Sequence, residues 1–81
     1  MQAAHRPVFS QTELIILLAE PLGESVARRL IRDGAASLGL GETFDQDAGL
    51  RLLERIAHRG GLVGIAARFS MSRLHLLGVQ R

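Results

Sequence analysis

The chain has 81 residues, a formal net charge of +2 and no cysteine, and 47% of its residues are hydrophobic. This length is enough for one domain, and the composition is that of a globular protein rather than a disordered one. The lack of cysteine excludes disulfides and thiolate metal sites, and the longest apolar run, residues 14–19, is too short to cross a bilayer. We therefore expect one soluble, cytoplasmic domain over residues 1–81. A chain this short and apolar often completes its hydrophobic core by self-association, so we expect a homo-oligomer such as a dimer.

The first helix is predicted to begin after a loose lead-in over residues 1–8. Ser10 and Glu13 have the spacing of a capping box, in which each side chain satisfies a backbone N–H of the other. The run that follows is apolar on nearly every side, so this helix is expected to be central or covered by a partner. Pro21 is expected to stop or kink it.

Two further helices are predicted from apolar residues at three-and-four spacing. The second covers about residues 22–37, with Gly39 as a left-handed cap. The third starts near Thr43 or Asp45, because acidic residues suit the positive end of a helix dipole, and it ends before the glycine pair at 60–61. No stretch has the alternation of a β-strand, and no internal repeat is visible.

Charge is unevenly distributed along the chain. Residues 1–54 carry five arginines and eight acids, for a net charge of −3, whereas residues 55–81 carry five arginines and no acid, for a net charge of +5. A basic end on an acidic body is typical of an anion-binding surface. The alternative is a solvated face, since patches of five charges are common on protein surfaces.

The last twenty residues allow two interpretations. In the first, two short helices meet at a tight turn over residues 70–72, and Ser72 caps the second helix. Two helices that cross steeply need apolar or small residues at a fixed set of buried positions. The sequence supplies such residues at Ile65, Ala66, Phe69, Met71, Leu76 and Val79.

At residues 62–81, and most closely from Ile65 to Arg73, the chain resembles the bacterial helix-turn-helix family of transcriptional regulators. It departs from the family at Ser70, where glycine is usual, and in the shortness of its second helix. The resemblance implies that the second helix enters the major groove of DNA, where Arg73 reads guanine. The base and phosphate contacts that it implies are Arg59, Arg68, Ser72, Arg73, His75 and Arg81.

In the second interpretation, residues 62–77 form one amphipathic helix, because serine weakens a helix only slightly. The stripe that would face the core is Leu62, Ile65, Ala66, Phe69, Ser72 and Leu76. Leu74 and Leu77 would then lie on a partner or dimer surface. Both interpretations predict an all-α fold, a small orthogonal bundle of four or five helices.

Two functional hypotheses follow. The first is a small non-enzymatic DNA-binding regulator, and the second is a helical protein–protein interaction or oligomerisation module in a bacterial regulatory or assembly complex. The three histidines are scattered without ligand spacing, and no nucleophile is paired with a base. We therefore expect no catalytic residue, metal, cofactor or small-molecule substrate. The expected partner is DNA or another protein, and not a membrane.

Overall fold

Two short strands, which the sequence did not predict, join two helical hairpins. β1 (Val8–Ser10) pairs antiparallel with β2 (Thr43–Asp45), and Phe9 lies opposite Phe44. The expectation that the chain contains no strand is therefore wrong. Each strand has three residues, which is too short for an alternating pattern to be visible.

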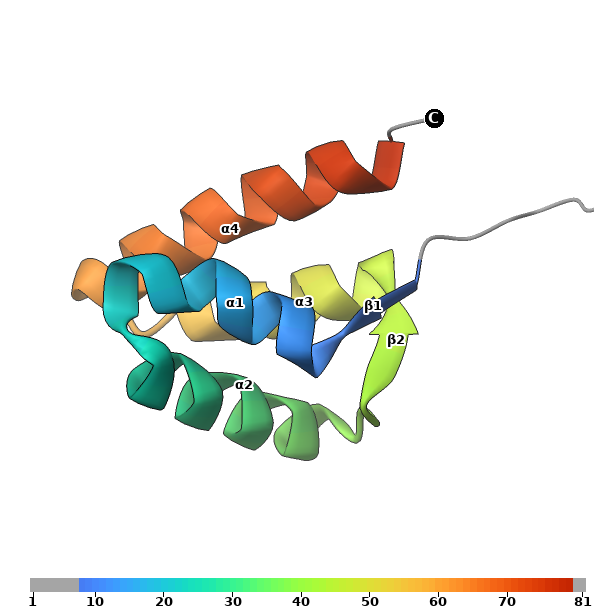
Figure 1. Ribbon diagram of the computed structural model, residues 1–81, viewed down its shortest axis with the longest axis horizontal. Coiled ribbons are helices and arrows are strands. Elements are labelled where there is room, and N and C mark those ends of the chain that lie inside the picture. The colour runs from blue at the N-terminus through green and yellow to red at the C-terminus, as the bar shows by residue number, and fades with distance from the viewer. Residues whose placement is uncertain (1–7, 80–81) are drawn as a thin grey trace, which may run out of the picture.

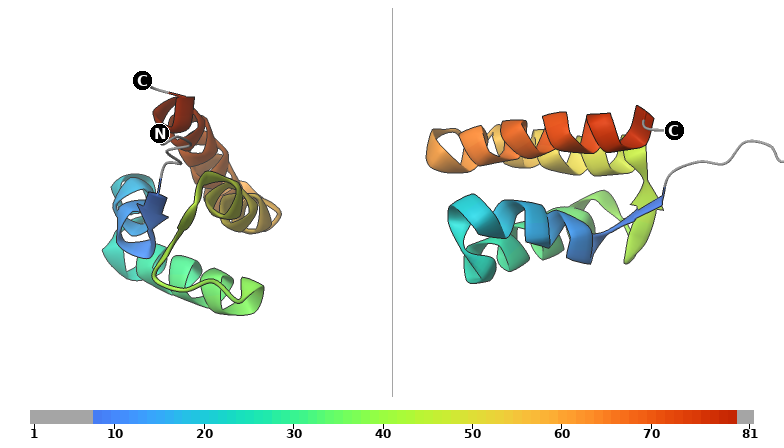
Figure 2. Two further views of the ribbon diagram at one scale, coloured as in Figure 1. Left: turned by 90° about the vertical axis from the view of Figure 1, so that its right-hand side faces the viewer. Right: turned by 45° about the horizontal axis from the view of Figure 1, so that its top comes forward.

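The structure is a computed structural model that describes residues 8–79, with side chains over residues 8–76. Its helices are α1 (Gln11–Leu22), α2 (Glu24–Leu38), α3 (Gln46–Ala57) and α4 (Gly61–Val79). They all run along the length of the molecule, α1 and α3 in one direction and α2 and α4 in the other (Figures 1 and 2). The mostly helical fold is confirmed, but the helices form antiparallel hairpins rather than the predicted orthogonal crossings.

The two halves of the chain have the same architecture. Each consists of a strand, a capped helix of 12 residues, a glycine with positive φ and a longer helix. Those glycines are Gly23 in the first half and Gly60 in the second. At the same offset of 35 residues, the sequences share phenylalanine, a capping residue and glutamine at residues 9–11 and 44–46, and a leucine pair at residues 17–18 and 52–53. The structural repeat was missed because so few positions preserve it.

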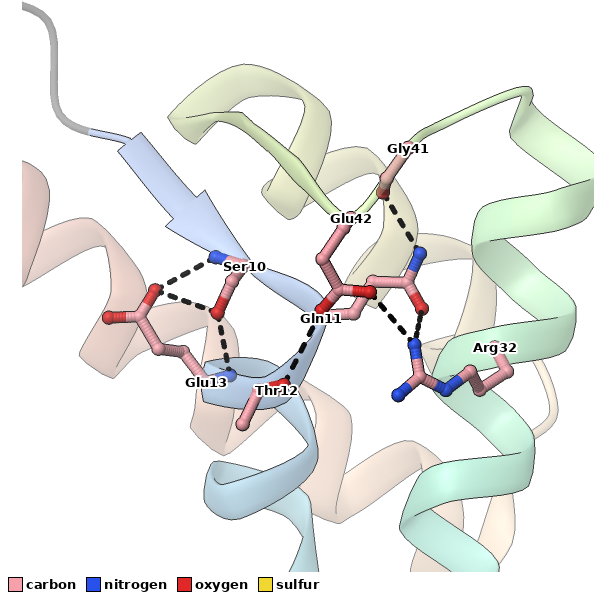
Figure 3. Close-up of polar contacts among 7 residues, drawn as sticks. All are labelled: Ser10, Gln11, Thr12, Glu13, Arg32, Gly41 and Glu42. Carbon is pink, nitrogen blue, oxygen red and sulfur yellow. Dashed lines mark hydrogen bonds and ion pairs between the residues drawn. The ribbon is translucent and has the colours of Figure 1, made fainter.

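The start of α1 is capped as predicted. Ser10 Oγ accepts a hydrogen bond from the Glu13 backbone N–H at 3.1 Å, and the Glu13 carboxylate accepts one from the Ser10 N–H at 2.8 Å (Figure 3). Pro21 does not end the helix, which continues to Leu22. A proline in the last turn removes only one helical hydrogen bond, so the chain turns at Gly23 instead, where φ is 88°.

A buried glutamine connects this helix start to the loop before β2. Gln11 is 7% exposed, and its Nε2 donates to the Gly41 carbonyl at 2.9 Å. Its Oε1 accepts from Arg32 at 2.7 Å, and Arg32 also pairs with Glu42 at 3.0 Å (Figure 3). These contacts hold α1, α2 and the loop together, so the polar groups of this cluster are engaged within the fold.

Glycines let α4 approach α3 closely at both ends of their contact. A Cβ added to Gly64 would lie 2.8 Å from the Ala57 carbonyl oxygen. A Cβ added to Gly49 would lie 3.0 Å from Leu74 Cδ2. A side chain at Gly64 would push the helices apart, because it would meet backbone, whereas one at Gly49 would require the Leu74 side chain to move.

We predict that Gly64→Ala destabilises the protein by up to about 2 kcal/mol. Alanine is the better helix former by about 1 kcal/mol, but overpacking against a backbone atom costs about 1–3 kcal/mol. Urea unfolding followed by circular dichroism measures the change, with Gly41→Ala as the control, because a Cβ there meets no atom within 4 Å. A Gly64→Ala variant more stable than the parent would contradict the close approach.

Candidate interaction surface

The C-terminal segment forms one helix. α4 runs unbroken from Gly61 to Val79, and none of the described non-glycine residues has a positive φ. The turn predicted at residues 70–72 is absent, so the helix-turn-helix interpretation is not confirmed and the single-helix interpretation describes the segment. Ser70 lies on the buried side of the helix, 2% exposed, where a larger residue could not fit as closely.

The buried side of α4 is built mostly from small residues. It carries Gly64, Ala66, Ala67, Ser70 and Leu74. This side packs mainly on α3 and also on α1. Because these residues project little from the helix, α4 can lie close to both neighbours.

Four large apolar residues of α4 face solvent instead. Leu62, Ile65, Phe69 and Leu76 are 64%, 67%, 64% and 64% exposed, and we refer to these four residues as the α4 ridge. Their spacing of three, four and seven residues places them along one side of the helix. A contiguous row of exposed apolar side chains often marks an interaction surface, whereas single exposed apolar residues are common on any protein.

The predicted sides of α4 are therefore exchanged. Leu62, Ile65, Phe69 and Leu76 were expected in the core, in the single-helix stripe, and they are exposed. Leu74 was expected on a partner surface, but it is 1% exposed. The side chain of Leu77 lies outside the described residues. The overlooked signal was Gly49 and Gly64, since glycine inside a helical pattern indicates close packing on that side.

Charged residues flank the ridge on two sides. On the side of α1, the Arg73 guanidinium lies 3.7 Å from the Glu20 carboxylate and 6.0 Å from the centre of the Phe69 ring. Both partners of the ion pair are largely exposed, so it contributes little to stability. On the other side, Arg68, Ser72 and His75 follow each other at helical spacing.

The residues implied as DNA contacts do not form one surface. The described ones, Arg59, Arg68, Ser72, Arg73 and His75, are all exposed. Arg59 precedes α4, and Arg73 lies across the ridge from Arg68, beside an acid of α1. Arg81 lies outside the described residues.

Two surface grooves lie between the helices. An open groove of about 590 Å³ between α2 and α3 is lined by Leu30, Asp33, Gly34, Ser37, Arg55, Ile56, His58 and Arg59. Its charged side chains are all exposed, and it offers no desolvated group for catalysis. A smaller apolar groove of about 180 Å³ lies between α1 and α4, beside Ile16 and Leu74.

Among residues 8–79, no three side chains of metal-binding type are grouped to hold an ion. No helix over the same residues has the length and apolarity needed to cross a membrane.

No protein-family model matches the chain, and comparisons with curated proteins and with solved structures give no match. The α4 ridge is therefore the feature from which a function can be argued.

We predict that Phe69→Ala changes the free energy of unfolding by at most about 1 kcal/mol, including the loss of the contact with Arg73. Leu74→Ala, which empties a buried position, should cost about 2–5 kcal/mol. Chemical unfolding at low protein concentration compares the two variants. Equal losses would mean that Phe69 belongs to the core.

Proposed function

We propose that this domain is a non-enzymatic protein-interaction module that binds its partner through the α4 ridge. The observation that carries the proposal is the row of four large apolar side chains, each about two-thirds exposed. The side of the helix that holds the fold together does not need them, because small residues make that contact. Exposed apolar side chains lower the solubility of a protein, and these four add nothing to its core. Their presence on the surface therefore favours a role in binding.

The first half of the chain supplies an internal comparison. α2 occupies in its hairpin the place that α4 occupies in the second hairpin. The outward side of α2 is polar, with Glu24, Arg28, Arg29 and Asp33 exposed and Val26, at 45%, as its one large apolar exception. The fold therefore tolerates a polar outer face at this position. The apolar outer face of α4 is a property of α4 and not a requirement of the architecture.

The ridge suits the apolar face of another helix. Residues 62, 65, 69, 72 and 76 alternate in steps of three and four, which is the spacing of a helix–helix seam. Covering each ridge side chain is worth roughly 1–2 kcal/mol at its present exposure. Association itself costs about 4–15 kcal/mol, so the ridge supports a complex of modest affinity in which the flanking contacts decide the strength.

The DNA-binding hypothesis has less support. It rests on a turn at residues 70–72, where α4 is continuous, and on the acid-free basic end over residues 55–81. Arg68 and Arg73 remain exposed cations, and steeply salt-dependent binding to random duplex DNA is the result that would favour this hypothesis.

Site-specific photo-crosslinking tests the proposal directly. A benzophenone amino acid at position 69 should yield protein crosslinks in cells, because that side chain lies at the centre of the ridge. The same amino acid at position 29, an exposed position on α2, is the matched control and should yield few. The proposal fails if both positions give the same products, or if position 69 crosslinks only to DNA.

A further inference from the structure

We infer that the groove between α2 and α3 binds a small phosphorylated compound that also carries hydroxyl groups, such as a sugar phosphate, as a ligand rather than as a substrate. No residue of the α4 ridge lines this groove, so the inference goes beyond the proposed function. Three features support it: the hollow between the two helices, the charges on its two walls, and a comparison with the equivalent place between α1 and α4.

Small residues on α2 shape the groove. At Gly34 the two helices are in close contact, because an added Cβ would overlap the Leu52 side chain of α3. Three residues further on, Ser37 has only a short side chain, and a space of about 590 Å³ lies between α2 and the last turn of α3. Small-molecule sites commonly have volumes of about 300–1,000 Å³. The groove therefore has the size of a small-molecule site.

The α3 wall of the groove carries two arginines and a histidine, Arg55, Arg59 and His58. Backbone hydrogen bonds hold this turn, from the His58 N–H to the Glu54 carbonyl at 3.2 Å and from the Arg59 N–H to the Ile56 carbonyl at 3.0 Å. Like charges four residues apart are neighbours on a helix and repel each other. The C-terminal dipole of a helix amounts to about half a negative charge, which is less than the two arginines supply. This wall therefore has positive charge to offer a ligand.

The α2 wall carries an acid and a hydroxyl group, on Asp33 and Ser37. Within residues 8–76, neither Arg55 nor Arg59 forms a side-chain hydrogen bond or ion pair, with Asp33 or with any other residue. Guanidinium groups bind phosphate through paired hydrogen bonds, and a carboxylate accepts hydrogen bonds from hydroxyl groups. A compound with a phosphate at one end and hydroxyl groups at the other therefore matches the two walls.

The structural repeat identifies an equivalent place in the other pair of helices. Residues of α1 correspond to residues of α3 at an offset of 35. Residues of α2 correspond to residues of α4 at an offset of 36, which aligns the buried residues 30–31 with the buried residues 66–67. By these offsets, Ser37 and Arg55 occupy the places of Arg73 and Glu20.

An ion pair bridges α1 and α4 at the place where α2 and α3 leave the groove. The Arg73 guanidinium reaches across from α4 to within 3.7 Å of the Glu20 carboxylate of α1. In the pair α2 and α3, a short serine replaces the long cation and a cation replaces the acid. The groove thus contains a cation, Arg55, at the place where the other pair supplies an acid. A ligand phosphate would provide the negative charge there.

Amide NMR at constant ionic strength tests the site with three probes: ribose 5-phosphate, inorganic phosphate and ribose. Ribose 5-phosphate should shift the signals of Ser37 and residues 58–60 in a saturable manner. Inorganic phosphate should act on residues 58–60 more weakly, and ribose alone should have no effect. If ribose 5-phosphate shifts none of these signals at concentrations up to about 10 mM, the site is overturned.

Arginine variants test whether the groove holds the phosphate. Arg55→Gln and Arg59→Gln should each raise the dissociation constant of ribose 5-phosphate about tenfold or more, because each removes a charge-assisted hydrogen bond. Arg51→Gln is the matched control, since it removes the same charge from the same helix outside the groove, and its effect should be much smaller at about 0.15 M salt. An equal effect of all three variants would show a general attraction of anions and would overturn the groove.

A variant of the α2 wall tests the hydroxyl contacts. Asp33→Ala should abolish the preference for ribose 5-phosphate over inorganic phosphate, while leaving inorganic phosphate bound at least as tightly as before. An unchanged preference would overturn the assignment of a hydroxyl-bearing ligand. Failure of any of these experiments leaves the α4 ridge untouched, because none of the substituted residues belongs to it.

Discussion

The close approach of α4 to α3 decides which side of α4 is buried. At Gly64 the two helices are so near that a single methyl group would meet the Ala57 carbonyl. Only small residues fit along this contact, and Ala67 and Ser70 continue it. Leu74 fits on this side because it lies over Gly49, whereas Leu62, Ile65, Phe69 and Leu76 face outward, where the described residues give them no cover. The interaction surface is in this sense a consequence of how the hairpin packs.

Several polar groups of the first half of the chain form contacts within the fold. Arg32 is held by Gln11 and Glu42, and Arg28 pairs with Glu24 one turn earlier on α2. The two strands set the hairpins against each other through Phe9 and Phe44, which are both buried. α4 differs because it carries no acid of its own, and its apolar outer side has no cover. The first three helices and the strands therefore serve as a scaffold, and α4 carries the candidate interaction surface.

Local chemistry predicted the elements better than their packing. The capping box at Ser10, the left-handed cap at Gly39 and the break at residues 60–61 are all confirmed, because each depends on neighbours in the sequence. The strands were missed because they depend on pairing between residues 35 positions apart, such as Phe9 with Phe44. The buried side of α4 was misassigned because hydrophobicity favours large residues in a core, whereas the distance between helices selects small ones. The distance between two helices cannot be read from a local sequence pattern.

The most direct test of the account is NMR of the protein with and without added cell extract. The ridge is proposed to be an interface, so the methyl signals of Leu62, Ile65 and Leu76 should shift or broaden when the extract supplies a partner. Leu52 and Leu53, which are fully buried between the helices, should not change and serve as internal references. If the ridge methyl signals stay constant while random duplex DNA at low salt shifts the backbone amide signals of Arg68 and His75, the surface has been assigned to the wrong partner.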